Sequence, residues 1–209
     1  MNITWYGTAS LFIESGNDRI LIDPFLPLRG AENHPSLFDY RQSDSILITH
    51  GHIDHLGSVP QIINDTDITV YCSGTPAATL ERKNADCDMI TLIRPGDVLH
   101  FGEITVTVMR GKHIRFDSPL IRRTLLNFRI LRYFPNFIQL LLKNGAFAEK
   151  NETLIFQIEA DGKKILVLGS LNLQEDTVYP QHVDMLVLPY QGATDLVTPA
   201  LSIIEKIKP

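Results

Sequence analysis

Three imidazoles and one carboxylate fall within six consecutive residues of this 209-residue chain. They occupy the segment 50–55, and they are His50, His52, Asp54 and His55. Neutral imidazole nitrogens and carboxylate oxygens are good ligands for zinc and related divalent ions. Gly51 separates the first two histidines, and its missing side chain lets the backbone fold tightly around an ion. The alternative is a polar loop with chance histidines, but the chain has only seven, so the residues predict a metal site.

His113 is the second candidate ligand, because it follows Gly111 and Lys112 at the end of a predicted strand. A lone histidine is more often an ordinary surface residue. Here a closed metal site needs a third imidazole, and a strand end would place one at the same rim. The three other histidines have no comparable setting and are expected to be structural or exposed; they are His34, His100 and His182.

The cluster directly follows Ser45–Thr49, a continuous apolar run typical of a strand covered on both faces. Further short runs rich in β-branched and aromatic residues predict strands; they are Asn2–Tyr6, Leu11–Glu14, Arg19–Ile22, Ile68–Cys72, Asp88–Ile93, Val98–Phe101, Ile104–Met109, Thr153–Glu159, Lys164–Leu168 and Asp184–Leu188. A loop is expected from Pro24 to about Asp39. Helices are predicted at Ser58–Ile63 and at Pro199–Ile207. A further helix is predicted to begin at Thr75-Pro76, with Thr75 as the cap residue and the proline as its first residue. This order predicts an α/β protein with helices outside two mostly antiparallel mixed sheets, an αββα sandwich.

An insertion at about 119–148 does not fit that order. Leu, Ile and Phe recur there at helical spacing among several arginines, and Pro135 should divide the segment into two helices. Three roles stay open: two helices packing on the domain, a lid near the site, or contact of 119–147 with an anionic membrane surface. The same arginines could pair with a substrate phosphate.

The composition is that of a globular protein, with 44% hydrophobic and 21% charged residues. A net charge of −5 disfavours a nucleic-acid partner. Cys72 and Cys87 are too few for a disulfide framework, so free buried thiols are expected, with one bridge as the alternative. The chain shows no signal peptide and no apolar stretch of 18 residues. These features favour a cytoplasmic protein, and they make no prediction of oligomeric state.

Several segments together resemble the metallo-β-lactamase superfamily. Trp5–Ser10 is similar to that family's opening strand and turn, and Ile20–Pro24 to its third strand, where the position of Asp23 supports the metal loop. The residues of 50–55 match the His-x-His-x-Asp-His motif, and His113 matches the next metal-binding histidine. The pattern is most similar to the lactonase-like branch, which includes ascorbate-6-phosphate lactonase. The resemblance implies one metallo-β-lactamase-like domain over residues 1–209.

The resemblance also implies two metal sites. One ion would be held by His50, His52 and His113, and a second by Asp54 and His55 with two later residues. The bridging aspartate among those later residues is replaced by Ser170, a neutral hydroxyl and a poorer bridge between two dications. The strand that bears the last ligand would begin where the chain stops, so a C-terminal strand is expected to be missing. One or two divalent ions are therefore expected, with zinc favoured and manganese or iron also suited to these ligands.

The mechanism that the resemblance implies is hydrolysis by a metal-bound hydroxide, with Asp54 as the catalytic residue that orients the water or accepts its proton. The substrate would be a small ester, lactone or phosphate ester, with an anionic or phosphorylated compound among the candidates. The alternative is a non-catalytic metal-binding or sensor protein that keeps the fold with an incomplete second site. A nuclease is disfavoured by the acidic balance and by the lack of an added substrate domain.

Overall fold

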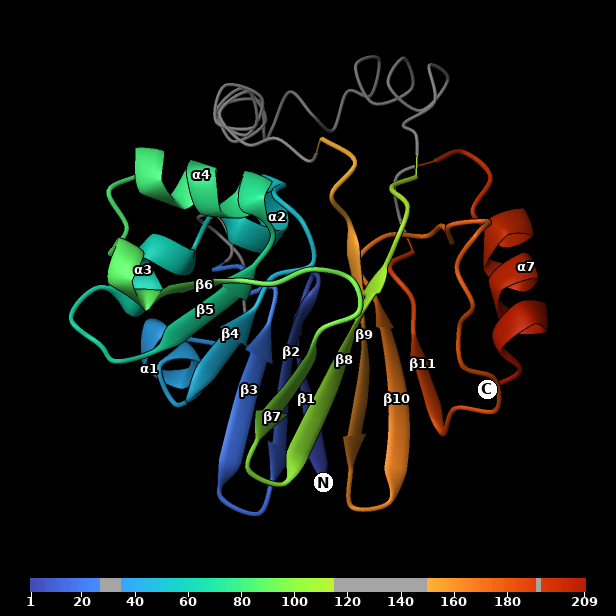
Figure 1. Ribbon diagram of the computed structural model, residues 1–209, viewed down its shortest axis with the longest axis horizontal. Coiled ribbons are helices and arrows are strands. Elements are labelled where there is room, and N and C mark those ends of the chain that lie inside the picture. Colours follow the sequence, from blue (N-terminus) through green and yellow to red (C-terminus); the bar gives the residue numbers. More distant parts are fainter. Residues whose placement is uncertain (27–34, 115–149, 191–192) are drawn as a thin grey trace.

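The computed structural model describes residues 1–26, 35–114, 150–190 and 193–209 of the chain. Two β-sheets face each other, and helices lie against the outer side of each sheet (Figure 1). The first sheet contains, in spatial order, β1 (Asn2–Gly7), β2 (Ser10–Ser15), β3 (Asp18–Ile22), β4 (Ser45–Leu47), β5 (Thr69–Cys72) and β6 (Ile90–Leu92). The second contains β11 (Met185–Val187), β10 (Lys163–Leu168), β9 (Leu154–Ala160), β8 (Ile104–Arg110) and β7 (Val98–Phe101). The αββα sandwich expected from the sequence is confirmed.

Both sheets are mixed. β1, β2 and β3 pair antiparallel, whereas β3 to β6 run parallel to one another. In the second sheet β7 to β10 are antiparallel and β11 lies parallel to β10. Antiparallel pairs therefore outnumber parallel ones by five to four among the described strands. The parallel half of the first sheet needs crossover connections, which helices supply.

Helices cover the two outer faces unequally (Figure 1). The first sheet is covered by α1 (Leu37–Tyr40), α2 (Ile53–Leu56), α3 (Val59–Ile63) and α4 (Gly74–Arg82), and the second by α7 (Val197–Ile207). Strand β3 shows how the layers are built: Ile20 and Ile22 enter the core between the sheets, while Leu21 enters the core under the helices. Successive side chains of a strand point to opposite faces, so a continuous apolar run suits this position.

Several predicted boundaries need correction. The loop expected up to Asp39 contains α1, which Ser36 caps by accepting a hydrogen bond from the backbone N–H of Asp39. The fourth helix begins at Gly74, so the proline at 76 is not its first residue. The strand expected from Asp88 is shorter, because Cys87–Met89 forms a 3₁₀ turn before β6. Local polar and turn residues decide such ends, and helix-end assignments shift easily by one or two positions.

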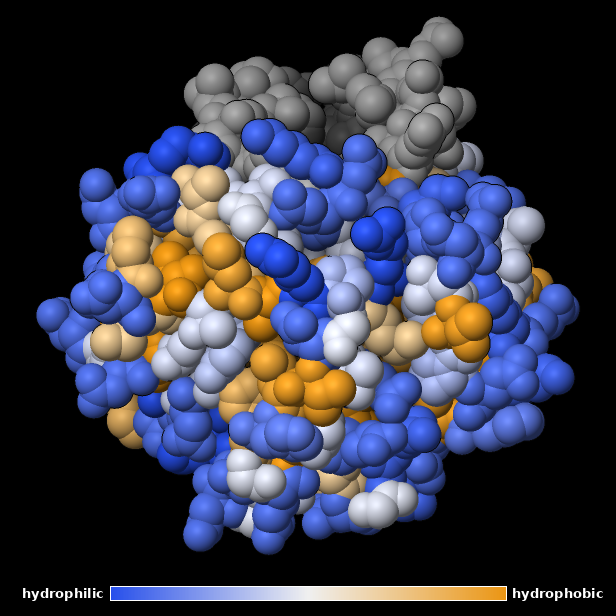
Figure 2. Space-filling model, in the orientation of Figure 1, coloured by the Kyte–Doolittle hydropathy of each residue, from blue (hydrophilic) through white to orange (hydrophobic). Residues whose placement is uncertain are grey.

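Both cysteines are free, as expected, but Cys87 is exposed rather than buried. Burial of Cys72, with a smaller effect of Glu152, raises the pKa of its thiol to about 12. Polar residues cover most of the surface in Figure 2, and hydrophobic residues form small separate patches. Within the described ranges, no helix is long and apolar enough to cross a membrane. The insertion at 119–148 lies outside the described residues.

Candidate metal centre

The cluster is positioned by the way the chain leaves β4. Four residues, 48–51, follow the strand, and α2 then begins with His52 as its N-terminal cap residue. The carbonyl of His52 accepts hydrogen bonds from the backbone N–H groups of His55 and Leu56, at 3.1 and 2.9 Å. This single helical turn brings His55 back beside the strand end, and the rings of His50 and His55 lie 3.9 Å apart between centroids.

Three of the predicted ligands meet in space. The ligand atoms of His50, His52 and His113 all lie within 4.8 Å of one another. Nε2 of His50 and Nδ1 of His52 are 3.1 Å apart, and the ring of His113 lies 5.0 and 4.6 Å from the two other rings. A tetrahedral ion with ordinary Zn–N bonds keeps its nitrogens about 3.3 Å apart. The geometry of this group, called the three-histidine group below, therefore fits a bound divalent ion.

Electrostatics also suit His50 to metal binding. Its side chain is almost fully buried. Burial lowers its pKa well below the ordinary value, and the imidazoles of His55, His52 and His113 lower it further. A neutral imidazole is the form that binds a metal, so His50 is a ligand that need not lose a proton near neutral pH.

His55 is held differently, by Asp23. The buried carboxylate of Asp23 lies 2.7 Å from Nδ1 of His55, and it accepts hydrogen bonds from the backbone N–H and the hydroxyl of Thr49 at 2.8 and 2.6 Å. Burial lowers the pKa of His55, but attraction to Asp23 and their hydrogen bond, with a smaller effect of Asp54, raise it overall. Asp23 thus fixes Nδ1 and leaves Nε2 of His55 for another partner.

Nε2 of His55 faces Asp54, whose Oδ2 lies 3.7 Å away. The Asp54 side chain is about 30% exposed, whereas that of His55 is 5% exposed. The two residues predicted to hold a second ion are therefore neighbours, with Asp54 on the more solvent-accessible side.

Asp23 has an unusual backbone, with φ of +46°. Such a conformation is uncommon for a residue other than glycine and is stabilised by its surroundings. The buried hydroxyl of Ser10 donates to the carbonyl of Asp23 and accepts from the N–H of Phe25, both at 2.8 Å. Ser10, the first residue of β2 and the end of the Trp5–Ser10 segment singled out by the sequence, therefore holds the backbone of Asp23 beside His55.

The two sheets meet at Thr49. Its hydroxyl lies 3.0 Å from Nδ1 of His50 and 3.3 Å from Nδ1 of His55, and its carbonyl accepts the N–H of Leu154 at 2.8 Å. Gly169 packs against it so closely that an added Cβ would lie 2.4 Å from Cβ of Thr49. Glycine is needed at this position because the second sheet approaches the metal loop there.

Ser170 stands next to the three-histidine group with a definite structural role. Its hydroxyl is buried and accepts a hydrogen bond of 3.0 Å from the N–H of Ile114. The carbonyl of Ile114 in turn lies 2.6 Å from Nδ1 of His113. Ser170 therefore anchors the strand end that presents His113, a contact that the sequence did not indicate.

The structure thus brings all five predicted site residues to one rim. Sequence reasoning missed the contacts of two hydroxyls: that of Thr49 with Asp23, and that of Ser10, in the Trp5–Ser10 segment, with the backbone of Asp23. Their position beside an aspartate-supported motif was the only signal. His100 and His182 are exposed, away from any such group. Tyr190, which follows β11, lines a pocket together with Asp23 and His55.

Comparisons with known proteins agree with this geometry. The chain belongs to the Beta-lactamase superfamily domain family, whose sequence model matches residues 2–209. It is similar to a protein named UPF0173 metal-dependent hydrolase from Alkaliphilus metalliredigens, with 27% identity over 201 residues covering 92% of this chain and 74% of that protein. A protein of the same name from Archaeoglobus fulgidus is 34% identical over 113 residues, which cover 54% of this chain and 46% of that protein.

Solved structures show the same fold. A metallo-beta-lactamase from Cronobacter sakazakii has a TM-score of 0.56 at 14% identity, covering 90% of this chain and 76% of that one. Zn(2+)-bound PqqB from Methylobacterium extorquens has a TM-score of 0.54 at 15% identity, covering 86% and 58%. Except for the Alkaliphilus protein, the matched part of the chain spans about half the length of its curated relatives.

Proposed function

We propose that the protein is a metal-dependent hydrolase that holds one divalent ion through His50, His52 and His113. The observation that supports this most strongly is the convergence of three imidazole ligand atoms within 4.8 Å, one of them on a buried side chain whose pKa is lowered. The name that its relatives share, metal-dependent hydrolase, is consistent with this assignment. Zinc suits three imidazoles best, and manganese and iron also accept such ligands.

A divalent ion at this position would supply Lewis acidity, polarising an ester, lactone or phosphate-ester oxygen and lowering the pKa of a water molecule. The chain's own residues have separate tasks. Asp54, on the accessible side of His55, orients the attacking water or accepts its proton. Asp23 holds Nδ1 of His55, and the hydroxyl of Thr49 contacts Nδ1 of both His50 and His55.

Ser170 supports a stoichiometry of one tightly held ion. Its hydroxyl is engaged by the N–H of Ile114, and a neutral oxygen brings no negative charge to a position between two cations. Metal analysis of the purified protein should find fewer than two equivalents per chain. Two tightly held equivalents would overturn this part of the proposal.

The same observation favours a second candidate, a metal-binding or sensor protein without turnover. The two functions are separated by activity. Hydrolysis of generic nitrophenyl esters and bis-nitrophenyl phosphate should be measured with the wild type and with His52→Ala. Turnover that is lost in His52→Ala supports the hydrolase, whereas metal binding without turnover of any substrate in the panel supports the sensor.

A further inference from the structure

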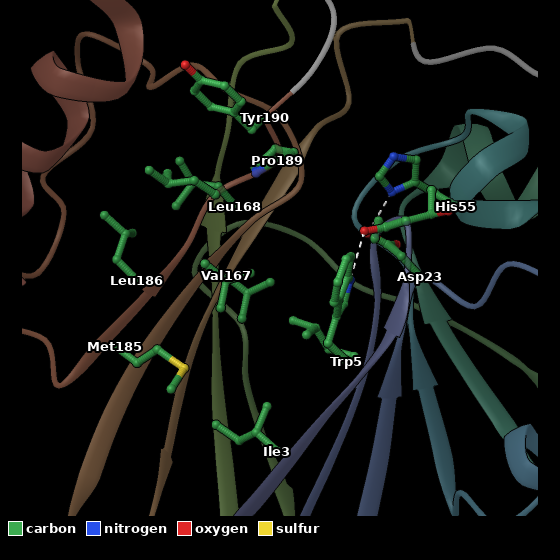
Figure 3. A pocket seen from close by; sticks show the side chains of 15 residues that line it. Ile3, Trp5, Asp23, His55, Val167, Leu168, Met185, Leu186, Pro189 and Tyr190 are labelled. Carbon is green, nitrogen blue, oxygen red and sulfur yellow. Dashed lines mark hydrogen bonds and ion pairs between the residues drawn. The ribbon is translucent and has the colours of Figure 1, made fainter. Parts of the chain in front are cut away.

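A largely apolar groove runs between the edges of the two sheets and reaches Asp23 and His55, beside the three-histidine group; none of the three proposed metal ligands is among its described lining residues. Its volume is about 660 Å³, which is within the usual range for small-molecule sites. One wall comes from β1 and β2 and the other from β10, β11 and the residues that follow β11. Asp23 and His55 lie at one end of the groove, while Ile3 and Met185 lie toward the other (Figure 3).

The lining is apolar over most of its length. Eleven of the fifteen lining residues have hydrocarbon, proline, thioether or indole side chains, and the remaining four are Thr8, Asp23, His55 and Tyr190. Two of these four polar residues, Asp23 and His55, contact each other beside the three-histidine group, whereas Thr8 lies in the turn after β1 and Tyr190 follows β11. No lysine or arginine is present among the lining residues in the part of the chain that the structure describes.

This distribution selects a class of ligand. A phosphate or carboxylate would lose its hydration against these apolar walls and would approach the carboxylate of Asp23. Among the described lining residues only His55 could offer it a positive charge, and that imidazole is already paired with Asp23. An alkyl or aryl chain instead releases water from apolar walls, which stabilises the complex in proportion to the apolar area buried.

We infer that the groove binds the non-reacting part of the substrate and that this part is an uncharged alkyl or aryl chain. This inference rests on the proposed function, because it assigns the substrate class of the same site. The scissile ester or lactone group would lie at the His55 end and the chain would extend toward Met185. Among the candidates raised by the sequence, this favours apolar esters and lactones over small phosphorylated compounds.

The groove contains its own reporter. Trp5 is the only tryptophan of the chain; it lines the groove, and 68% of its side chain is exposed. Its indole N–H donates to the carbonyl of Thr8 at 3.1 Å (Figure 3). A chain bound alongside should remove water from the indole and shift its emission to shorter wavelength, without any need for metal or turnover.

The test is a fluorescence titration of the metal-free protein with neutral aliphatic amides from butanamide to decanamide. We expect a saturable blue shift, with affinity rising about two- to fourfold for each added methylene. Inorganic phosphate and glycerol 3-phosphate should give no shift and should not compete. A shift that is independent of chain length, or displacement of decanamide by phosphate, would overturn the inference.

A matched pair of variants locates the binding. Met185→Lys places a charge in the groove, whereas Leu201→Lys makes the same kind of change at an exposed apolar residue of α7 outside it. The first should weaken decanamide binding by at least about tenfold, and the second should leave it unchanged. Equal binding by both variants would show that the groove is not the site.

The two proposals fail separately. If the protein binds amides but no metal ion, the hydrolase proposal fails and the groove is still supported as an apolar binding site. If the protein binds metal and hydrolyses esters but no amide shifts the emission of Trp5, the hydrolase proposal is supported and the inference that the groove binds an apolar chain is refuted.

Discussion

His50 and His55 lie five residues apart and their rings touch, yet the protein treats them in opposite ways. His50 is surrounded by other imidazoles, and its pKa is lowered by burial and by those neighbours. His55 is just as buried, but its contact with Asp23 raises its pKa overall. Equal burial therefore does not decide the state of a histidine, since a single well-placed carboxylate outweighs desolvation. Substitutions at five positions, His50, His55, Asp23, Gly169 and Ser170, test how far this difference divides the site into a metal-binding side and a supporting side.

The largest effect is expected from removing His50. His50→Ala takes one of three imidazoles from the ion, so we expect metal affinity to fall by at least about 100-fold, whereas His55→Ala should cost only about tenfold. Competition with a chromophoric chelator measures both. His100→Ala, at an exposed position on β7, is the control that should bind metal normally. Equal losses in the His50 and His55 variants would mean that the two sides are not distinct.

Asp23→Asn acts on the supporting side. It removes the charge that holds His55 and weakens a buried network, so urea unfolding of the metal-free protein should show a loss of about 3 kcal/mol. The pKa of His55 in the folded state is raised above 6.5. The wild type should therefore gain stability that is complete below about pH 6.5 and is lost as pH rises through the folded-state pKa.

The stability of Asp23→Asn should not fall over this pH range, because His55 in the variant lacks the carboxylate that raises its pKa. The matched check is the imidazole titration of His55 by NMR, where Asp23→Asn should lower the pKa. An unchanged titration would refute the assignment of Asp23 as its cause.

Gly169→Ala tests the contact that both sides share. The new Cβ would press on Thr49 at 2.4 Å, and this residue is short and β-branched, so it cannot move away easily. Overpacking of this kind should destabilise the protein by about 1–3 kcal/mol in thermal or urea unfolding. Gly74→Ala is a suitable comparison, because the nearest heavy atom to its added Cβ lies 4.0 Å away. Similar stabilities of the two variants would argue against a tight approach at Thr49.

The smallest effect should come from Ser170→Ala, which touches only the His113 side. The buried N–H of Ile114 loses its acceptor, which should cost about 1 kcal/mol of stability and a few-fold in metal affinity. Ser170→Asp is the sharper companion, since a carboxylate there should raise the number of bound ions if the missing charge alone limits the second site. No change in stoichiometry would assign that limit to another missing ligand.

Much of the fold could be predicted because its signals are local. Short runs of β-branched and aromatic residues located most of the strands, including the antiparallel neighbours β2 and β3, and β9 and β10. The predicted starts of α4 and β6 were wrong. In the first turn of α4 the N–H of Thr75 binds the carboxylate of the distant Glu152, and a 3₁₀ turn takes the place of the first residues of the predicted strand; periodicity registers neither feature. The helix α1 was missed because four residues are too few to show a period.

The sequence by itself determined the ligand types at 50–55 and the strand that leads into them, because spacing along one short segment is a local property. The tertiary structure alone decided which distant residues join them: His113 from the segment after β8, Asp23 directly after β3, and Ser170 just after β10. It also decided the opposite pKa shifts of His50 and His55 and the groove beside Trp5. These depend on how two sheets pack face to face, and the distances across that interface are set by the whole core rather than by any one stretch of sequence.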